Sequence, residues 1–274
     1  MTLTEAAPAK VNLALHVRRR RPDGYHDLET IFAFTDFGDT LHGAASDRLS
    51  LIVEGEFAPT IGAADNLVLR AARALATAAE VAGGAALRLT KRIPVAAGLG
   101  GGSADAAAAL RLLNRLWQLD WPLARLAEIG DELGADVPAC VFGTTQVGYG
   151  RGEKLTPYIE ADLAGTPILL VNPRVTMPTG PVFAGWDGID HGALDLALPL
   201  TEMRNDLTGS ARSIDAVIGT VLTALDEFGA IPSRMSGSGA TCLGLFADER
   251  ACAAAHDRIA SGFPGWWSVA TTLR

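Results

Sequence analysis

The glycine-rich segment at residues 94–104 is the strongest chemical signal in the sequence. It reads Pro-Val-Ala-Ala-Gly-Leu-Gly-Gly-Gly-Ser-Ala and stands between an expected strand and an expected helix. Glycine lets backbone N–H groups approach a ligand closely, and the free N–H groups of a helix N-terminus favour negative charge. The segment therefore predicts a polyphosphate site, in which Ser103 could cap the helix or meet Mg²⁺. The alternative is a glycine turn that serves only tight packing.

Two other phosphate motifs fit this segment poorly. No Gly-Lys-Ser/Thr sequence follows the glycines, which excludes a Walker A loop. A dinucleotide fingerprint would need a third glycine where Ser103 stands, and Asp120 precedes Trp121-Pro122 instead of ending a strand. A dehydrogenase of the Rossmann class is therefore disfavoured.

Lys10 and Asp136 are the charged candidates for chemistry. Lys10 begins the alternating segment 10–17, which indicates a half-buried, fixed position, although a lone lysine there would more often be a strand-edge charge. Asp136 lies in an apolar stretch, where an unpaired carboxylate is costly to bury, so we expect a positive partner. Phosphoryl transfer needs a clamp for a triphosphate, Mg²⁺, and a group that orients or deprotonates the hydroxyl. Asp136 with Lys10 would supply that last group.

The elements that must position these residues alternate irregularly between strands and helices. A long hairpin is expected in the first 40 residues, around the turn residues Pro22-Asp23-Gly24. Asp65 is a plausible helix N-cap, Ser103 could begin a second helix, and Pro122 could open a third that stops near Gly134. The other expected strands are 48–53, 86–93, 167–171, 242–246 and 267–273; the other expected helices are 210–228 and 248–260, and residues 173–199 are a broken stretch.

Composition limits the class of protein. The 274 residues carry a net charge of −8 and are 49% hydrophobic, which predicts a globular protein that does not bind nucleic acid or anionic membranes. No stretch approaches 18 apolar residues and no leader is evident, so a cytoplasmic location is expected. The three cysteines, Cys140, Cys242 and Cys252, have no metal-ligand spacing and are expected to be buried or incidental.

Three motifs in order resemble those of the GHMP kinases: residues 7–13 (Ala-Pro-Ala-Lys-Val-Asn-Leu), 94–104 and 236–241 (Ser-Gly-Ser-Gly-Ala-Thr). Within that class, residues 21–26 (Arg-Pro-Asp-Gly-Tyr-His) and 134–138 (Gly-Ala-Asp-Val-Pro) resemble the diphosphocytidyl-methylerythritol kinases, as do Phe32 and Gly38-Asp39. The resemblance covers roughly residues 7–246.

The resemblance implies an α+β, two-domain GHMP kinase fold. Residues 1–160 would form a ribosomal S5 domain 2-like ATP-binding domain, residues 161–274 a ferredoxin-like α/β sandwich, and the active site would lie in the interdomain cleft. The implied activity is ATP-dependent phosphorylation of the C2 hydroxyl of 4-diphosphocytidyl-2-C-methyl-D-erythritol in the non-mevalonate route to isoprenoid precursors of a bacterium. The alternatives are a GHMP kinase for mevalonate, homoserine or a sugar, and a non-catalytic ATP- or ligand-binding regulator on the same fold.

The resemblance also implies site residues. Lys10 and Asp136 correspond to the catalytic pair. The implied ATP contacts are Pro94, Val95, Ala96, Ala97, Gly98, Leu99, Gly100, Gly101, Gly102, Ser103 and Ala104, with Asn66 near the adenine. The implied substrate contacts are Asn12, Tyr25, His26, Phe32 and Phe183.

The implied ligands are ATP with Mg²⁺ and CDP-methylerythritol, with no tightly bound organic cofactor. Wider GHMP members often have two serines in the glycine loop, whereas here Ser103 alone supplies the hydroxyl for Mg²⁺. A monomer or a weak homodimer is expected.

Overall fold

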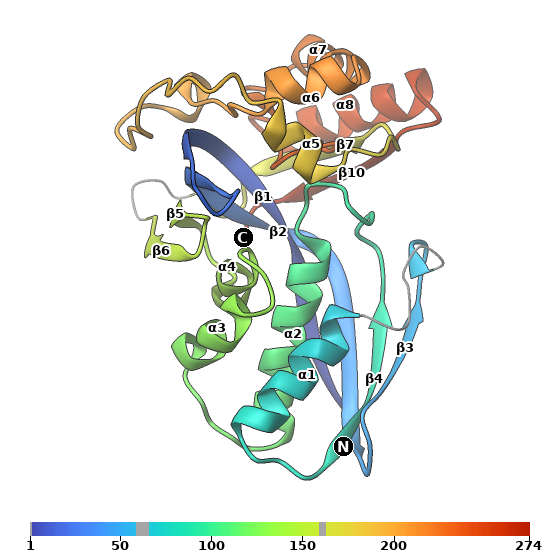
Figure 1. The fold of residues 1–274 in the computed structure, drawn as a ribbon. Helices are drawn as coiled ribbons and strands as arrows, with labels where there is room; N and C mark the ends of the chain where they lie inside the picture. Colours follow the sequence, from blue (N-terminus) through green and yellow to red (C-terminus); the bar gives the residue numbers. More distant parts are fainter. Residues whose placement is uncertain (1, 59–65, 159–162) are drawn as a thin grey trace. The chain divides into compact units, whose positions relative to one another are not determined.

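The computed structural model describes residues 2–58, 66–158 and 163–274 (Figure 1). The chain divides into two compact units. The first unit comprises residues 1–10, 37–95 and 100–144, and the second comprises 11–36, 96–99 and 145–274. The boundary expected between residues 160 and 161 lies in the segment 159–162, outside the described residues, so that domain division stays a prediction.

The first two strands form the expected hairpin. Strand β1 spans Thr2–Arg20 and pairs with β2, which spans His26–Ser46. Gly24 adopts a left-handed conformation in the turn between them, with φ of 86°. Lys10 was expected to be half-buried, but Lys10, Asn12 and His16 on the polar face are all buried. Burial of the polar face is costly unless its side chains find partners inside the protein.

In the first unit, helices pack on one end of a mixed sheet. Strand β4 (Gly84–Thr90) pairs antiparallel with residues 40–46 of β2, and β3 (Ser50–Glu54) lies parallel to β4. The helices are α1 (Leu67–Ala78), α2 (Gly101–Leu116), α3 (Leu123–Asp131) and α4 (Val137–Phe142). The alanine-rich α2 packs against α1 and α4, and a Cβ on Gly43 would lie 2.6 Å from Leu112, so this helix and the sheet are in close contact.

Two expected helix caps differ from the observed ones. Asp65 lies outside the described residues, and Asn66 is the N-cap of α1, where its side chain accepts from the Val68 N–H at 2.8 Å. Ser103 is not a cap, because α2 begins at Gly101 and Gly100 is its N-cap in the left-handed conformation. Glycine takes that conformation at little cost, so the cap lies at Gly100, three residues before the expected Ser103.

The second unit holds a four-stranded antiparallel sheet in the order β10-β7-β9-β8. These strands are β7 (Pro167–Asn172), β8 (Ser233–Met235), β9 (Cys242–Leu245) and β10 (Trp267–Thr272). The helices are α5 (Thr179–Ala184), α6 (Thr208–Ile214), α7 (Val217–Glu227) and α8 (Glu249–Gly262), with a short 3₁₀ turn, η2 (Leu200–Glu202). Strands β5 (Gln146–Gly150) and β6 (Lys154–Pro157) belong to the sheet that contains β2, not to this four-stranded sheet. Strand β5 pairs with residues 28–32 of β2, and β6 pairs with β5.

The single helix expected at 210–228 is two helices, α6 and α7. Asp215 has extended backbone angles between them, and its carboxylate accepts the Val217 N–H at 2.9 Å. An aspartate that bonds a nearby backbone N–H competes with the helix and ends it. The stretch expected to be broken at 173–199 contains one short helix, α5.

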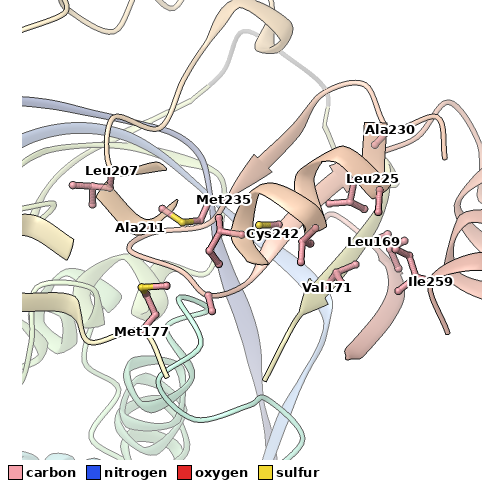
Figure 2. Packing of buried hydrophobic residues seen from close by; sticks show 14 of the residues in the cluster. Leu169, Val171, Met177, Leu207, Ala211, Leu225, Ala230, Met235, Cys242 and Ile259 are labelled. Carbon is pink, nitrogen blue, oxygen red and sulfur yellow. The ribbon is translucent and has the colours of Figure 1, made fainter. Parts of the chain in front are cut away.

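The helices of the second unit cover a hydrophobic core on the sheet (Figure 2). Leu169 and Val171 of β7 face Leu225 of α7 and Ile259 of α8 within this cluster. All three cysteines are free and buried, as expected. Burial raises the pKa of the Cys140 thiol to about 12 and that of Cys252 to about 11. Within the described residues, no helix is long and apolar enough to cross a membrane.

Candidate active site

Lys10 and Asp136 form an ion pair in the first unit. The Lys10 Nζ lies 2.9 Å from the Asp136 Oδ2, and the side chains are 5% and 34% exposed respectively. Lys10 comes from β1, and Asp136 is the residue before α4. The ammonium is therefore buried, while part of the carboxylate stays open to a ligand. A buried lysine with one partly open carboxylate partner suits the binding and orientation of a hydroxyl group.

Gly100 lies directly against this ion pair. A Cβ on Gly100 would lie 3.8 Å from the Asp136 Oδ2 and closer still to the Lys10 side chain. The N-terminus of α2 is therefore adjacent to both charged groups. The first N–H groups of a helix have no carbonyl partner within the helix, so this end favours a negatively charged group. Gly102 is exposed and Ser103 is partly exposed at this first turn.

A buried charge cluster supports the same helix end and was missed in the sequence. Lys91 binds two carboxylates: Asp39, and Asp105 at 2.5 Å. A Cβ on Gly101 would lie 3.2 Å from the Lys91 Nζ, so the cluster packs against the first turn of α2. Asp39 also accepts from the N–H groups of Arg92 and Ile93, which fixes the chain where it enters the glycine segment.

Two carboxylates share one lysine in this cluster, so their combined negative charge, when both are ionised, exceeds its positive charge. Burial raises the pKa of Asp105, and the neighbouring Asp39 raises it further against the opposing effect of Lys91. Burial opposes the charge of Lys91, but Asp105 and Asp39 outweigh it and raise the pKa of that lysine. Asp39 and Asp105 are acidic residues in apolar segments. The cost of burying an unpaired carboxylate, which pointed to Asp136, points equally to both of them.

In the second unit, residues 96–99 pack against the loop 236–239. The Ser236 hydroxyl donates to the Gly98 carbonyl at 2.8 Å, and the Thr241 N–H donates to the Ala97 carbonyl at 3.1 Å. Asn205 donates to the carbonyls of Met235 and Gly237 at 2.7 and 2.8 Å. The third sequence motif thus supports the glycine segment through backbone contacts. Asn205 was not singled out from the sequence.

Asn12 is placed on β1 beside the same loop. Its backbone N–H donates to the Ser236 hydroxyl at 3.1 Å, and its side-chain amide donates to the Thr30 hydroxyl at 2.8 Å. Thr30 in turn donates to the Ala14 carbonyl at 2.6 Å. This chain of hydrogen bonds fixes the orientation of the Asn12 side chain.

Aromatic residues of the second unit gather around His26. Its ring centroid lies 5.1 Å from that of Phe183 and 5.7 Å from that of Trp186, which meets it edge-on. Burial, with a smaller contribution from Arg20, lowers the pKa of His26, so its ring is neutral at pH 7. Among the described residues, neither the His26 Nε2 nor the Trp186 Nε1 has a hydrogen-bond partner, although both are buried. Trp186 was missed because its segment matched no motif.

Tyr25 and Phe32 differ in their accessibility. Tyr25 is 56% exposed, with the Arg151 guanidinium 5.4 Å from its ring centroid, so it presents an aromatic face. Phe32 is only 2% exposed, and a Cβ on Gly148 would lie 2.7 Å from its ring. The resemblance implied both residues as substrate contacts, but only the Tyr25 ring is exposed in the structure.

The residues present allow a magnesium ion only with help from a ligand. The described residues contain no cluster of three or more His, Cys, Asp or Glu side chains that could hold a metal. Mg²⁺ commonly keeps several waters and binds through one or two protein groups together with substrate phosphates. Ser103, partly exposed on the first turn of α2, fits the role of such a single protein ligand.

Two family models match the chain. The GHMP kinases N terminal domain matches residues 66–144, and the GHMP kinases C terminal domain matches residues 190–265. The chain is 51% identical to 4-diphosphocytidyl-2-C-methyl-D-erythritol kinase of Rhizorhabdus wittichii, over 99% of this chain and 94% of the relative. The chain belongs to the 4-diphosphocytidyl-2-C-methyl-D-erythritol kinase family of GHMP kinases. The relative of the same name from Sphingopyxis alaskensis is 48% identical over 100% of this chain and 99% of its own length.

Solved structures agree with this kinase family. A crystal structure of 4-(cytidine 5'-diphospho)-2C-methyl-D-erythritol kinase matches with a TM-score of 0.84 and 33% identity, over 99% of each chain. The homoserine kinase of Cytophaga hutchinsonii matches with a TM-score of 0.74 but 17% identity, over 99% of this chain and 95% of that one. The second likeness shows the fold alone. The expected α+β fold of the GHMP kinases is confirmed.

Proposed function

We propose that this chain transfers the γ-phosphoryl group of ATP to the C2 hydroxyl of 4-diphosphocytidyl-2-C-methyl-D-erythritol. The products are the 2-phosphate and ADP, in the non-mevalonate route to isoprenoid precursors. The names of the relatives, at up to 51% identity over nearly the whole chain, support the substrate. The observation that carries the chemistry is the Lys10–Asp136 ion pair against Gly100 at the N-terminus of α2.

Asp136 and Lys10 act on the hydroxyl in this proposal. The exposed part of the Asp136 carboxylate accepts a hydrogen bond from the C2 hydroxyl, orients it, and accepts its proton early or late in the transfer. Lys10 anchors the carboxylate at 2.9 Å and stabilises the negative charge that develops. Little covalent chemistry is required of the protein, because positioning and electrostatics dominate phosphoryl transfer.

The glycine segment 94–104 receives the phosphates of ATP. The N–H groups of Gly101, Gly102 and Ser103 open α2 and are positioned to donate to phosphate oxygens. Asn66, the N-cap of α1, is proposed to lie near the adenine. Mg²⁺, when bound, would supply positive charge that offsets the negative charge of the ATP phosphates. The Ser103 hydroxyl is the protein group that would hold it.

The aromatic residues receive the cytosine end of the substrate. Tyr25 and Phe183 offer ring faces, and the neutral His26 can read the polar edge of a pyrimidine through its unpartnered Nε2. Asn12, fixed by Thr30 and Ser236, is proposed to contact the erythritol end. Phe32 supports this region from the core of the strand and does not stack on the base.

We further propose a cytoplasmic location in a bacterium and a monomer or weak homodimer. Three free, buried cysteines suit a reducing compartment. The net charge of −8 disfavours nucleic acid and anionic membranes as partners.

The test is ADP release by the purified protein with Mg²⁺-ATP. CDP-methylerythritol is compared with mevalonate, homoserine and galactose as acceptors, and each assay is repeated with Lys10→Ala. Turnover with the cytidine substrate alone, lost in the variant, supports the function and the site together. Turnover with a different acceptor, or none despite ATP binding, would reject the proposed substrate.

A further inference from the structure

A cavity of about 540 Å³ lies in the second unit, and none of the residues proposed to touch ATP or CDP-methylerythritol lines it. Its wall is formed by residues 201–208, by α7 and by residues 230–235. Leu222, Ala230 and Ile231 supply apolar surface, and Thr201, Thr208 and Ser233 supply hydroxyl groups. The cavity is large enough for a small organic molecule.

Arg234 is the unusual member of this wall, because it is a buried cation without an anion. It is 7% exposed, and its guanidinium donates to the carbonyl oxygens of Leu13, Met203 and Leu200, the last at 2.8 Å. All three acceptors are neutral, and the donors are Nη1 and Nη2, which leaves Nε outside these bonds. Within the described part of the chain, no carboxylate lies within ion-pair distance of Arg234.

A buried positive charge that faces only neutral carbonyls is expensive. Burial lowers the pKa of Arg234 to about 10, yet the group remains protonated at neutral pH. An incoming anion would offset that cost, and hydrogen bonds between a guanidinium and an oxyanion are among the stronger ones in proteins. The positive charge of Arg234 therefore favours the binding of an anion in this cavity.

The other charged residues of the wall limit how much negative charge fits. Arg204 is already paired with Asp206 at 2.6 Å. Asp226, near the end of α7, is exposed and also lines the cavity, where it opposes an anion. The wall thus offers one uncompensated cation, one opposing carboxylate, hydroxyl groups and apolar surface.

We propose that this cavity binds a small organic oxyanion, a carboxylate or phosphate group on an apolar body, with Arg234 as its cation. The apolar body lies against Leu222 and Ile231. Asn205 lines the same cavity and holds the carbonyls of Met235 and Gly237, so an occupant touches a residue that fixes the loop 236–239. The site does not depend on the proposed kinase reaction, since none of its lining residues acts in that reaction.

The test titrates the full chain separately with benzoate and with inorganic phosphate, following backbone amide shifts by two-dimensional NMR. Saturable shifts at Leu222, Ser233 and Arg234 with either probe are expected. Saturation with benzoate alone identifies a carboxylate on an apolar body, and saturation with phosphate alone identifies a phosphate group. Absence of saturable shifts with both probes overturns the proposal.

Variants locate the binding without disturbing the three hydrogen bonds of Arg234. Asp226→Asn removes the opposing charge and is expected to tighten binding about two- to five-fold, the scale of an exposed charge interaction. Glu227→Gln makes the same charge change one residue away, outside the cavity wall, and should leave the dissociation constant unchanged. Thr201→Asp should weaken binding by a similar factor. Equal affinity in all three variants would show that the probes bind elsewhere.

Discussion

Ser236 contacts Gly98 through both its hydroxyl group and its carbonyl oxygen. Its hydroxyl donates to the Gly98 carbonyl at 2.8 Å, and its own carbonyl oxygen lies 2.4 Å from the place where a Cβ on Gly98 would be. Gly98 also has φ of 77°, which an L side chain rarely adopts. The contact between the glycine segment and the third motif therefore requires glycine for two separate reasons.

Gly98→Ala is expected to destabilise the protein by about 2–4 kcal/mol, because backbone strain and a clash with Ser236 add. Gly188→Ala is the matched control. Gly188 has φ of 80° but nothing within 4 Å of an added Cβ, so this variant carries the strain alone. Urea unfolding compares the two, and equal losses would contradict the clash.

Gly100→Ala is expected to lower kcat at least about ten-fold, because its Cβ would lie 3.0 Å from the Lys10 Cε and force the lysine to move. Gly143→Ala is the control, since Gly143 has a similar φ of 62° but a nearest contact of 3.7 Å. The quantity measured is kcat at saturating ATP and CDP-methylerythritol. Similar kcat values in the two variants would show that the position of Lys10 does not matter.

Asp136→Asn is expected to lower kcat by about 10²–10⁴-fold, the range typical of a lost proton acceptor. The KM for ATP should change little, because Asp136 is proposed to act on the hydroxyl. Glu132→Gln, an exposed acidic residue just after α3, serves as the control for general charge effects. Turnover of Asp136→Asn near that of the wild type would remove Asp136 from the mechanism.

Asp105 should make stability fall as pH rises. Burial raises the pKa of Asp105 in the folded protein above 3.8, its usual value in an unfolded chain. At a pH between the unfolded and the folded pKa, the folded protein holds a proton that the unfolded chain has released. The free energy of unfolding then decreases with pH, by at most about 1.4 kcal/mol per pH unit. Asp105→Asn should flatten this slope in urea titrations at pH 5, 6 and 7. An unchanged slope in the variant would place the titration elsewhere.

Trp186→Ala is expected to raise the KM for CDP-methylerythritol several-fold with little effect on kcat. The indole contacts the His26 ring edge-on, so the substitution removes one of the two ring contacts that orient His26. Trp266→Ala is a control, because Trp266 stacks on Phe263 and is not among the residues proposed to contact the substrate. A fall in kcat at unchanged KM would place Trp186 in the chemical step instead.

Local patterns predicted those parts of the fold that depend on near neighbours along the chain. The hairpin around Gly24 and the strand at 167–171 follow from alternation, turn residues and apolar runs. The break at Asp215 was missed, because its cause is one side-chain hydrogen bond that apolar periodicity does not reveal. The start of α2 was misplaced because Ser103 is a better cap by residue type than Gly100, which the close packing on Lys10 requires.

Pairings between site residues far apart in the sequence were only partly predicted. Asp136 was expected to need a positive partner, and the structure brings it to Lys10. The pairing of Lys91 with Asp39, 52 residues away, leaves no periodic trace in the sequence. Trp186 lacked any signal, since only the fold brings it to His26.

The three buried thiols can report local unfolding of the protein. A thiol with a raised pKa and no solvent access reacts with alkylating reagents only when its surroundings unfold. Cys140 belongs to the first unit, whereas Cys242 and Cys252 belong to the second. Alkylation rates resolved by peptide mass spectrometry would therefore separate the local unfolding of one unit from that of the other, without any engineered label.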